Sequence, residues 1–259
     1  MLLGFDIGNT NTVLGIYRGG GAAPEATYRF RTVRDVTADE LGAMVSAFVR
    51  NHGESNPGEV SVSGVAIASV VPEVNRRFHE MTARYFSLPL LEISHRATMP
   101  ISLVYDDPST LGVDRIVNAV AAHVEYPGDK IIIDIGTAAT VCVLHSDGRF
   151  DGGLIAPGIG TTIDALALRT SQLERITFRK PDALVATSTR EAITSGFYYG
   201  WLSMIEGLIT RIENRYNKGF LPVLTGGYAS ILSPELGRPH TCDAMLTMKG
   251  IRYLYQLNQ

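Results

Sequence analysis

Apolar residues recur along this chain with two periods, one typical of strands and one typical of helices. Residues 2–17 are rich in apolar and β-branched side chains and are interrupted by Gly8-Asn9-Thr10-Asn11, which predicts a strand, a tight turn and a second strand. Thr37-Ala38-Asp39-Glu40 has the spacing of a helix capping box, and apolar residues at helical spacing follow it as far as Val49. The same criteria predict further strands over 27–32, 62–71, 90–93, 131–134, 139–145 and 222–224, and further helices over 72–85, 112–126, 188–216 and 246–257.

Glycine and proline mark the expected breaks between these elements. Gly152-Gly153 and Pro157-Gly158-Ile159-Gly160 predict loops, and residues 95–111, which carry Pro100 and Pro108, predict an irregular segment. Because strands and helices alternate throughout, the predicted fold class is α/β.

An internal repeat indicates two similar domains. Residues Asp6–Val13 can be laid without a gap on Asp134–Val141, and the Asp, Ile, Gly, Thr and Val of the two segments then coincide. The copies lie about half a chain length apart, too far for the short period of a solenoid. We therefore expect two domains, 1–115 and 116–259, each opening with the same strand, turn and strand.

Composition and charge narrow the class of protein further. The chain is 45% apolar and 19% charged, so it can bury a large core, and its net charge of −3 gives no basic excess for nucleic acid or a membrane surface. Cys142 and Cys242 are the only cysteines, too few for a disulfide framework, and they fit a reducing compartment. No apolar run is long enough to span a bilayer, and we expect a cytoplasmic protein.

The first predicted hairpin carries residue types suited to binding a phosphate. Gly8 permits close approach of a ligand to the backbone, and successive N–H groups in such a turn can form an anion-binding concavity. The adjacent carboxylate, Asp6, could hold Mg²⁺, usually through water, because Mg²⁺ gives up its hydration shell reluctantly. The alternative is an ordinary hairpin in which Asp6 caps its own turn.

Two further segments add to this pattern. The repeat at Asp134 would supply a second phosphate cradle, so a nucleotide could lie in a cleft between the two domains. In Leu224–Ala229 a short strand leads into Gly226-Gly227, and glycines there let a base or ribose lie against the backbone near a helix start. Taken alone, such a glycine pair before a helix is mostly a simple turn.

The combination resembles the superfamily of sugar kinases, heat-shock ATPases and actin, whose duplicated ribonuclease H-like fold we therefore expect. Within it, type III pantothenate kinase is the family that fits most closely. The resemblance rests on Tyr105, Gly112-Val113-Asp114-Arg115-Ile116-Val117-Asn118-Ala119, Asp134-Ile135-Gly136-Thr137-Ala138 and Gly152-Gly153-Leu154-Ile155-Ala156-Pro157-Gly158. It extends from Asp6 to Gly226-Gly227.

This resemblance implies that ATP phosphorylates the 4′-hydroxyl of pantothenate, the first step of coenzyme A synthesis. A primary alcohol is a weak nucleophile, and a positioned carboxylate can orient it and accept its proton. Asp114 is the expected general base, the alternative being a carboxylate that only favours a helix terminus. Arg115 could pair with a substrate carboxylate or form a structural ion pair.

The resemblance also implies the remaining binding roles. Mg-ATP would be bound by Asp6, Ile7, Gly8, Asn9, Thr10, Asn11, Thr12, Val13, Thr137, Gly226 and Gly227, with Asp6 serving Mg²⁺ through water. Pantothenate would be bound by Tyr105, Gly112, Val113, Asp114, Arg115 and Thr189, although Thr189 could act only locally at its helix start. Asp134 would bind a monovalent cation, K⁺ or NH₄⁺. A homodimer is implied, with residues 197–201 at its interface or packed internally.

Two residues depart from the fullest family pattern. Ala139 stands where a second threonine is expected, and Cys142 where an aspartate is often found, but neither change touches the proposed catalytic carboxylates. Two other functions stay open, because a fold does not fix a substrate. One is another small-molecule kinase on the same scaffold, and the other is a non-catalytic nucleotide-binding accessory or regulatory relative.

Overall fold

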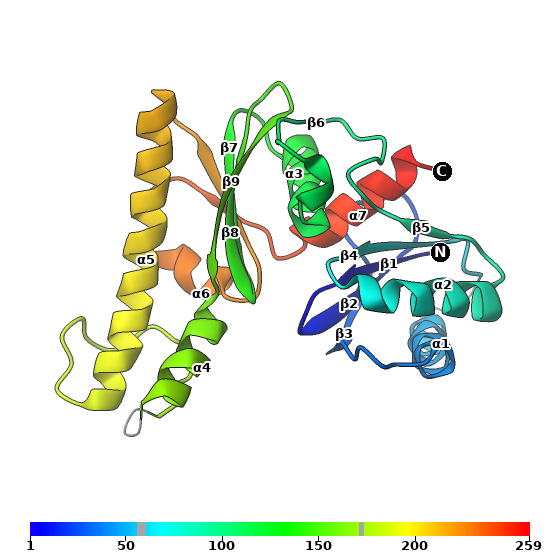
Figure 1. The fold of residues 1–259 in the computed structure, drawn as a ribbon, viewed down its shortest axis with the longest axis horizontal. Coiled ribbons are helices and arrows are strands. Elements are labelled where there is room, and N and C mark those ends of the chain that lie inside the picture. Colours follow the sequence, from blue (N-terminus) through cyan, green and yellow to red (C-terminus); the bar gives the residue numbers. More distant parts are fainter. Residues whose placement is uncertain (56–60, 171–173) are drawn as a thin grey trace. The chain divides into compact units, whose positions relative to one another are not determined.

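The computed structural model describes residues 1–55, 61–170 and 174–259, which divide into two compact units (Figure 1). The first unit comprises Met1–Pro100, Tyr105–Ala121 and Met245–Gln259, and the second comprises Ile101–Val104 and Ala122–Ala244. The assignment of 1–115 and 116–259 to two actin-like domains stays a prediction. The compact units follow those ranges except around residues 101–121 and at the C-terminal segment, which returns to the first unit.

The first unit contains a five-stranded sheet in the order β3-β2-β1-β4-β5. Its first two pairings are antiparallel, and β1 with β4 and β4 with β5 are parallel. The elements are β1 (Leu2–Ile7), β2 (Asn11–Tyr17), β3 (Ala26–Arg31), α1 (Ala38–Ser55), β4 (Gly64–Ser69), α2 (Pro72–Phe86), β5 (Leu90–Glu92) and α7 (Leu246–Leu257), with α3 (Val113–Glu125) crossing the division between the units.

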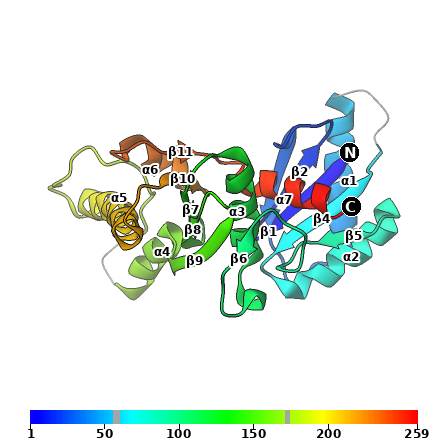
Figure 2. The ribbon, with the colours of Figure 1, turned by 90° about the horizontal axis from the view of Figure 1, so that it is seen from above.

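The alternation of side chains along β1 assigns the two faces of this sheet. Leu3, Phe5 and Ile7 are fully buried in one core with apolar residues of α1 and α2. The opposite face carries Gly4 and Asp6, and α7 packs on β1 and β4 there. Figure 2 shows α7 in front of these strands.

The second unit repeats this topology in a six-stranded sheet of order β11-β10-β7-β8-β9-β6. The pairings of β7 with β8 and of β8 with β9 are antiparallel, and β10 pairs in parallel with β7. The elements are β6 (Ser102–Leu103), β7 (Lys130–Ile135), β8 (Ala138–Leu144), β9 (Arg149–Pro157), α4 (Ile159–Arg169), α5 (Thr189–Tyr216), β10 (Leu221–Thr225), α6 (Ala229–Leu232) and β11 (Thr241–Cys242), with a short 3₁₀ helix at 233–235. Another 3₁₀ helix, at 108–110, belongs to the first unit.

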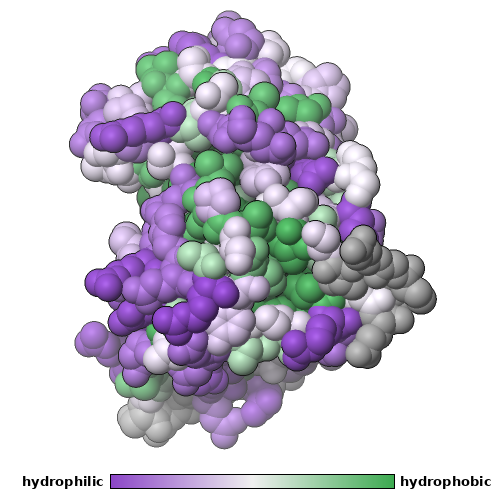
Figure 3. All heavy atoms as spheres, turned by 90° about the vertical axis from the view of Figure 1, so that its right-hand side faces the viewer, coloured by the Kyte–Doolittle hydropathy of each residue, from purple (hydrophilic) through white to green (hydrophobic). Residues whose placement is uncertain are grey.

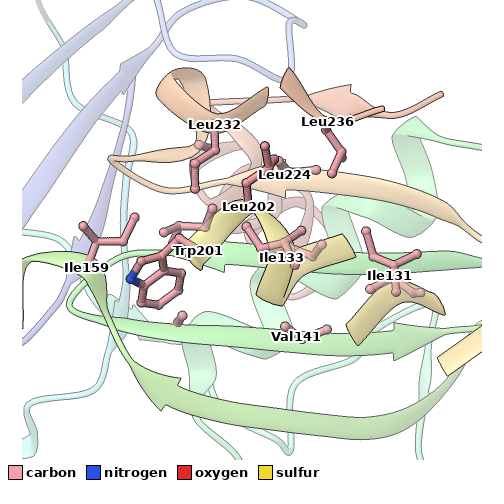
Figure 4. Close-up of a cluster of buried hydrophobic side chains, with 14 of the residues drawn as sticks. Ile131, Ile133, Val141, Ile159, Trp201, Leu202, Leu224, Leu232 and Leu236 are labelled. Carbon is pink, nitrogen blue, oxygen red and sulfur yellow. The ribbon is translucent and has the colours of Figure 1, made fainter. Parts of the chain in front are cut away.

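The core of the second unit lies between this sheet and α5. Figure 4 shows Ile131 and Ile133 of β7 and Val141 of β8 near Trp201 and Leu202 of α5. All five are at least 91% buried, so α5 is held mainly by apolar packing.

The loop predicted at Gly152-Gly153 is wrong, because both glycines lie inside strand β9. A side chain at Gly153 would clash with the Val141 carbonyl, and a register shift follows between Cys142 and Leu144 of the neighbouring strand. The glycine therefore marks a close approach of two strands at an irregularity rather than a break. The predicted loop over 157–160 is also partly wrong, since α4 begins at Ile159.

Within the described ranges, no helix combines the length and apolar character needed to cross a bilayer. Figure 3 shows one face of the molecule, on which hydrophilic side chains surround a smaller hydrophobic area. Such mixing is ordinary for a folded protein surface.

Candidate active site

Thr32, the residue that follows β3, fixes the turn of the first hairpin through hydrogen bonds. Gly8 N donates to Asn11 O at 3.1 Å and closes the turn. Thr32 Oγ1 donates to Gly8 O at 2.7 Å and lies 2.9 Å from Thr12 Oγ1, while Thr32 N donates to Thr10 O at 3.1 Å. Together these bonds hold the backbone of the turn in place, while Asn9 and Thr10 are exposed to solvent.

Two residues of the predicted phosphate segment do not present their side chains to a ligand. Ile7 is fully buried in the core with α1 and α2, and Thr12 is 1% exposed and bonded to Thr32. Only their backbone atoms remain for contact with a phosphate. Asp6 is half-buried and lies on the other face of β1.

The gapless alignment of the two hairpins is wrong after the glycine. In the first hairpin Ile7 pairs with Thr12, whereas in the second Ile135 pairs with Ala139. Gly136 N donates to Ala138 O at 3.1 Å, so the second turn is one residue shorter. Ala139, and not Thr140, is therefore the structural counterpart of Thr12, and it is buried as Thr12 is.

Asp134 lies near the end of β7, and the turn at Gly226 packs closely against it. It pairs with Thr225 of β10, and the glycine that follows, Gly226, adopts a φ of +91°. A Cβ on Gly226 would lie 2.5 Å from Asp134 Oδ1 and 2.6 Å from Ile135 N. A side chain at residue 226 would therefore displace the half-buried Asp134 carboxylate or the β7 backbone.

The glycine pair is a turn followed by a very short helix. Tyr228 N donates to Ile135 O at 3.3 Å, which ties the turn back to β7, and α6 has four residues. Gly227 is exposed, with nothing near the position of a Cβ. The expected helix start is therefore too short to add a substantial dipole, and the backbone of the glycines is what this turn can offer a nucleotide.

Asp114 is the second residue of α3, so it lies at a helix start as predicted, and it is half-buried. Its Oδ1 accepts a hydrogen bond from Arg115 N at 2.8 Å. A Cβ at Gly112 would lie 2.5 Å from the same oxygen, so a side chain there would move the carboxylate from this position. Burial raises the pKa of Asp114 above its usual range, and the Arg115 amide and guanidinium oppose that rise in part. A raised pKa moves a carboxylate toward the range useful to a general base.

Arg115 and Tyr105, both predicted at the substrate site, contact each other. Arg115 is 4% exposed, its Nη1 donates to Tyr105 Oη at 3.3 Å, and its Cζ lies 5.6 Å from the centre of the tyrosine ring. This pairing fixes Tyr105 next to the Asp114 helix start. The first unit therefore assembles Tyr105, Gly112, Val113, Asp114 and Arg115 in one place.

Thr189 is the exposed first residue of α5, in the second unit. The preceding Ser188 caps this helix by accepting a hydrogen bond from Glu191 N at 3.4 Å. Thr137, Asp134 and Gly226-Gly227 also belong to the second unit. The sequence did not indicate Thr32 or Tyr17 as functional, because their contacts depend on the register of β2 and β3 and on the packing of α7.

The candidate site carries carboxylates singly rather than in clusters. Among the residues that the structure describes, no group of three or more His, Cys, Asp or Glu side chains could hold a metal ion. Single carboxylates such as Asp6 and Asp134, each beside a glycine turn, leave most ligands to phosphates, carbonyls or water.

Solved structures with a similar fold span almost the whole chain. A Campylobacter jejuni protein described as a Baf family transcriptional activator superposes with a TM-score of 0.61 at 16% identity, over 98% of this chain and 97% of that one. A ROK family glucokinase from Streptomyces griseus, in complex with glucose and AMPPNP, gives 0.54 at 13% identity, over 98% and 99%. These likenesses concern the fold alone, and with the repeated sheet topology they confirm the predicted duplicated ribonuclease H-like fold.

Sequence comparison is more specific. A family model described as type III pantothenate kinase matches residues 2–211. The type III pantothenate kinase of Brevibacillus brevis is 39% identical over 259 residues, which cover 100% of both chains. The chain therefore belongs to the type III pantothenate kinase family.

Proposed function

We propose a role for individual residues of this chain in ATP-dependent pantothenate phosphorylation, the reaction of its family. The observation that carries the proposal is the half-buried Asp114 carboxylate at the start of α3, flanked by Gly112, Arg115 and Tyr105. Release of ADP that depends on pantothenate, by the purified protein, tests it.

Asp114 acts as the general base. It accepts the proton of the 4′-hydroxyl as the hydroxyl oxygen forms a bond to the γ-phosphorus of ATP and the bond between that phosphorus and ADP breaks. The Arg115 N–H bond to Oδ1 orients the carboxylate, and the other oxygen is left to face the alcohol. Tyr105, Gly112, Val113 and Arg115 line the pantothenate site with it, and Thr189 is proposed as a further contact.

The first hairpin binds phosphate through its backbone. Thr32 holds the Gly8 carbonyl and Thr12, and Gly8 N is used within the turn, so the backbone of residues 9–11 is what this turn would offer an anion. Asp6 would hold the Mg²⁺ of Mg-ATP through water, and that ion neutralises charge on the phosphates. We propose nucleotide contacts in the second unit from Thr137 and Gly226-Gly227.

Replacing K⁺ by Na⁺ at constant ionic strength is expected to lower the affinity for ATP several-fold. We assign Asp134 as the carboxylate ligand of a monovalent cation, K⁺ or NH₄⁺, because this half-buried carboxylate lies near the end of β7 beside the backbone of the Gly226 turn. Titration of ATP binding in each salt measures the effect, and Asp134→Asn should abolish the difference. Equal ATP affinity in both salts for the wild type would remove this role.

We propose that the chain forms a homodimer through α4 and α5. A cavity of about 530 Å³ there is lined by Ala156, Pro157, Thr162, Leu166, Ile193, Gly196, Phe197, Gly200, Trp201 and Met204. Nothing lies near the position of a Cβ at Gly196 or Gly200, although glycine weakens a helix, so these residues suit the close approach of a second copy. Trp201 itself belongs to the core of its own unit.

Sedimentation equilibrium tests this interface. The wild type is expected to sediment as a dimer and Gly200→Arg as a monomer, because an arginine at this exposed position has room within one chain and would obstruct only a partner. A monomeric wild type, or a Gly200→Arg variant that dimerises as the wild type does, would contradict the proposal.

A further inference from the structure

The C-terminal helix α7 lies in a channel that glycines open on the first sheet. Gly4 of β1 and Gly15 of β2 are paired across the strands. A Cβ on Gly15 would lie 2.6 Å from Met248 Cε, and one on Gly4 would lie 3.0 Å from Ile251 Cγ2. The missing side chains let α7 approach the strands that carry the phosphate-binding turn.

Two adjacent residues of α7, Thr247 and Met248, are hydrogen-bonded to two different elements, α3 and β2. Met248 O accepts a hydrogen bond of 2.6 Å from Tyr17 Oη on β2, and Thr247 Oγ1 donates one of 2.7 Å to Asn118 Oδ1 on α3. Tyr17 is 1% exposed and its bond is buried, whereas the bond between half-buried Thr247 and Asn118, which is 2% exposed, is partly buried. Burial raises the pKa of the Tyr17 hydroxyl, which keeps it protonated as a donor.

Asn118 connects this junction to the proposed base. It lies four residues after Asp114 on α3, so the two side chains share one face of that helix. The backbones of the two helices also approach closely, since a side chain at Gly250 would clash with the Val117 carbonyl. Asp6 lies on the same face of β1 as Gly4, the face on which α7 packs.

We infer that Thr247 and Asn118 are positioning residues, which set the place of Asp114 relative to the strands bearing Asp6 and the phosphate-binding turn. The inference rests on the proposed role of Asp114 in phosphoryl transfer. Thr247 does not touch the substrate. It holds α3 at a fixed position on α7, while its neighbour Met248 is fixed to β2. A displacement of about 1 Å at reacting groups can lower a rate by about 10²-fold.

Thr247→Val tests this directly, because it removes the hydroxyl and keeps the shape of the side chain. The expected kcat is about 10-fold or more below that of the wild type, with a KM for ATP close to the wild-type value, since the turn that binds phosphate stays on its own strands. Thr247→Ser keeps the donor and should restore kcat. The matched control is Thr210→Val on α5, whose hydroxyl bonds only to Glu206 O within an exposed helix turn.

A double-mutant cycle separates positioning from a general loss of stability. The double variant Asn118→Ala/Thr247→Val is expected to reduce kcat no more than Asn118→Ala alone, because Asn118→Ala already removes the bond between these two residues. An unchanged kcat in Thr247→Val, multiplicative losses in the cycle, or a Thr247→Ser variant as impaired as Thr247→Val would overturn the inference. A wild-type protein without pantothenate-dependent ADP release would instead contradict the proposed function.

Discussion

Asp114→Asn is expected to lower turnover by about 10²–10⁴-fold, the usual contribution of a general base. Asparagine keeps the shape of the side chain and an oxygen that can accept the Arg115 N–H bond, so ATP affinity should hardly change. Steady-state kinetics with nucleotide titration measures both quantities. Asp106→Asn, at an exposed carboxylate eight residues earlier, is the matched control and should retain wild-type turnover.

The pH dependence gives the same residue a second test. Burial raises the pKa of Asp114, and a base must be ionised, so kcat/KM of the wild type should fall on the acid side at a pH above the usual range for aspartate. A carboxylate with a raised pKa in the folded protein lowers stability once the pH exceeds that pKa. Asp114→Asn should therefore be no less stable than the wild type at neutral pH. Wild-type turnover in Asp114→Asn would remove the assignment.

Gly226→Ala is expected to lower the free energy of unfolding by about 2–5 kcal/mol. Its φ of +91° disfavours any residue with a side chain, and the new methyl group would overlap Asp134 Oδ1 and the backbone of Ile135. The melting temperature should fall by about 5–15 °C, since each kcal/mol corresponds to a few degrees in a chain of this size. Because the methyl group displaces Asp134, the dependence of ATP binding on K⁺ should be lost as well.

The neighbouring glycine supplies the control. Gly227→Ala places a methyl group where nothing lies within 4 Å, and residue 227 has no positive φ. Its melting temperature should stay within about 2 °C of the wild type, as for most surface substitutions. Equal destabilisation by the two substitutions would show that Asp134 is not enclosed as described.

Local chemistry made several elements predictable. Thr37 and Glu40 form the expected capping box, in which Thr37 N donates to Glu40 Oε2 at 2.8 Å and Glu40 N donates to Thr37 Oγ1 at 3.2 Å, so α1 begins where its sequence indicates. The final helix has the predicted bounds, Leu246–Leu257, because its apolar residues repeat at helical spacing. In the site, the position of Asp114 at the start of its helix was predicted in the same way.

Features that depend on contacts distant in sequence were not predictable. The shorter second turn follows from the pairing of Ile135 with Ala139, which no spacing within the repeat reveals. Glycine is typical of turns, yet Gly153 lies inside strand β9. The glycine is needed there because a side chain would clash with the Val141 carbonyl of the neighbouring strand. Thr32 gave no signal of its own, since its bond to Gly8 O depends on how β3 lies beside β2.

Fold and substrate rest on different observations. The glucokinase and the protein described as a transcriptional activator share the architecture at 13% and 16% identity, so architecture alone leaves the phosphoryl acceptor undecided. The assignment of pantothenate depends on family membership, and its residue roles depend on the cluster around Asp114.

A coupled assay of ADP release by the purified protein, with Mg-ATP and K⁺, in the presence and absence of pantothenate, tests the central claim most directly. The account predicts ADP release only with pantothenate, together with a product whose mass is that of pantothenate plus one phosphoryl group. The same rate of ATP turnover with and without pantothenate, or nucleotide binding without turnover in any monovalent cation, would contradict it.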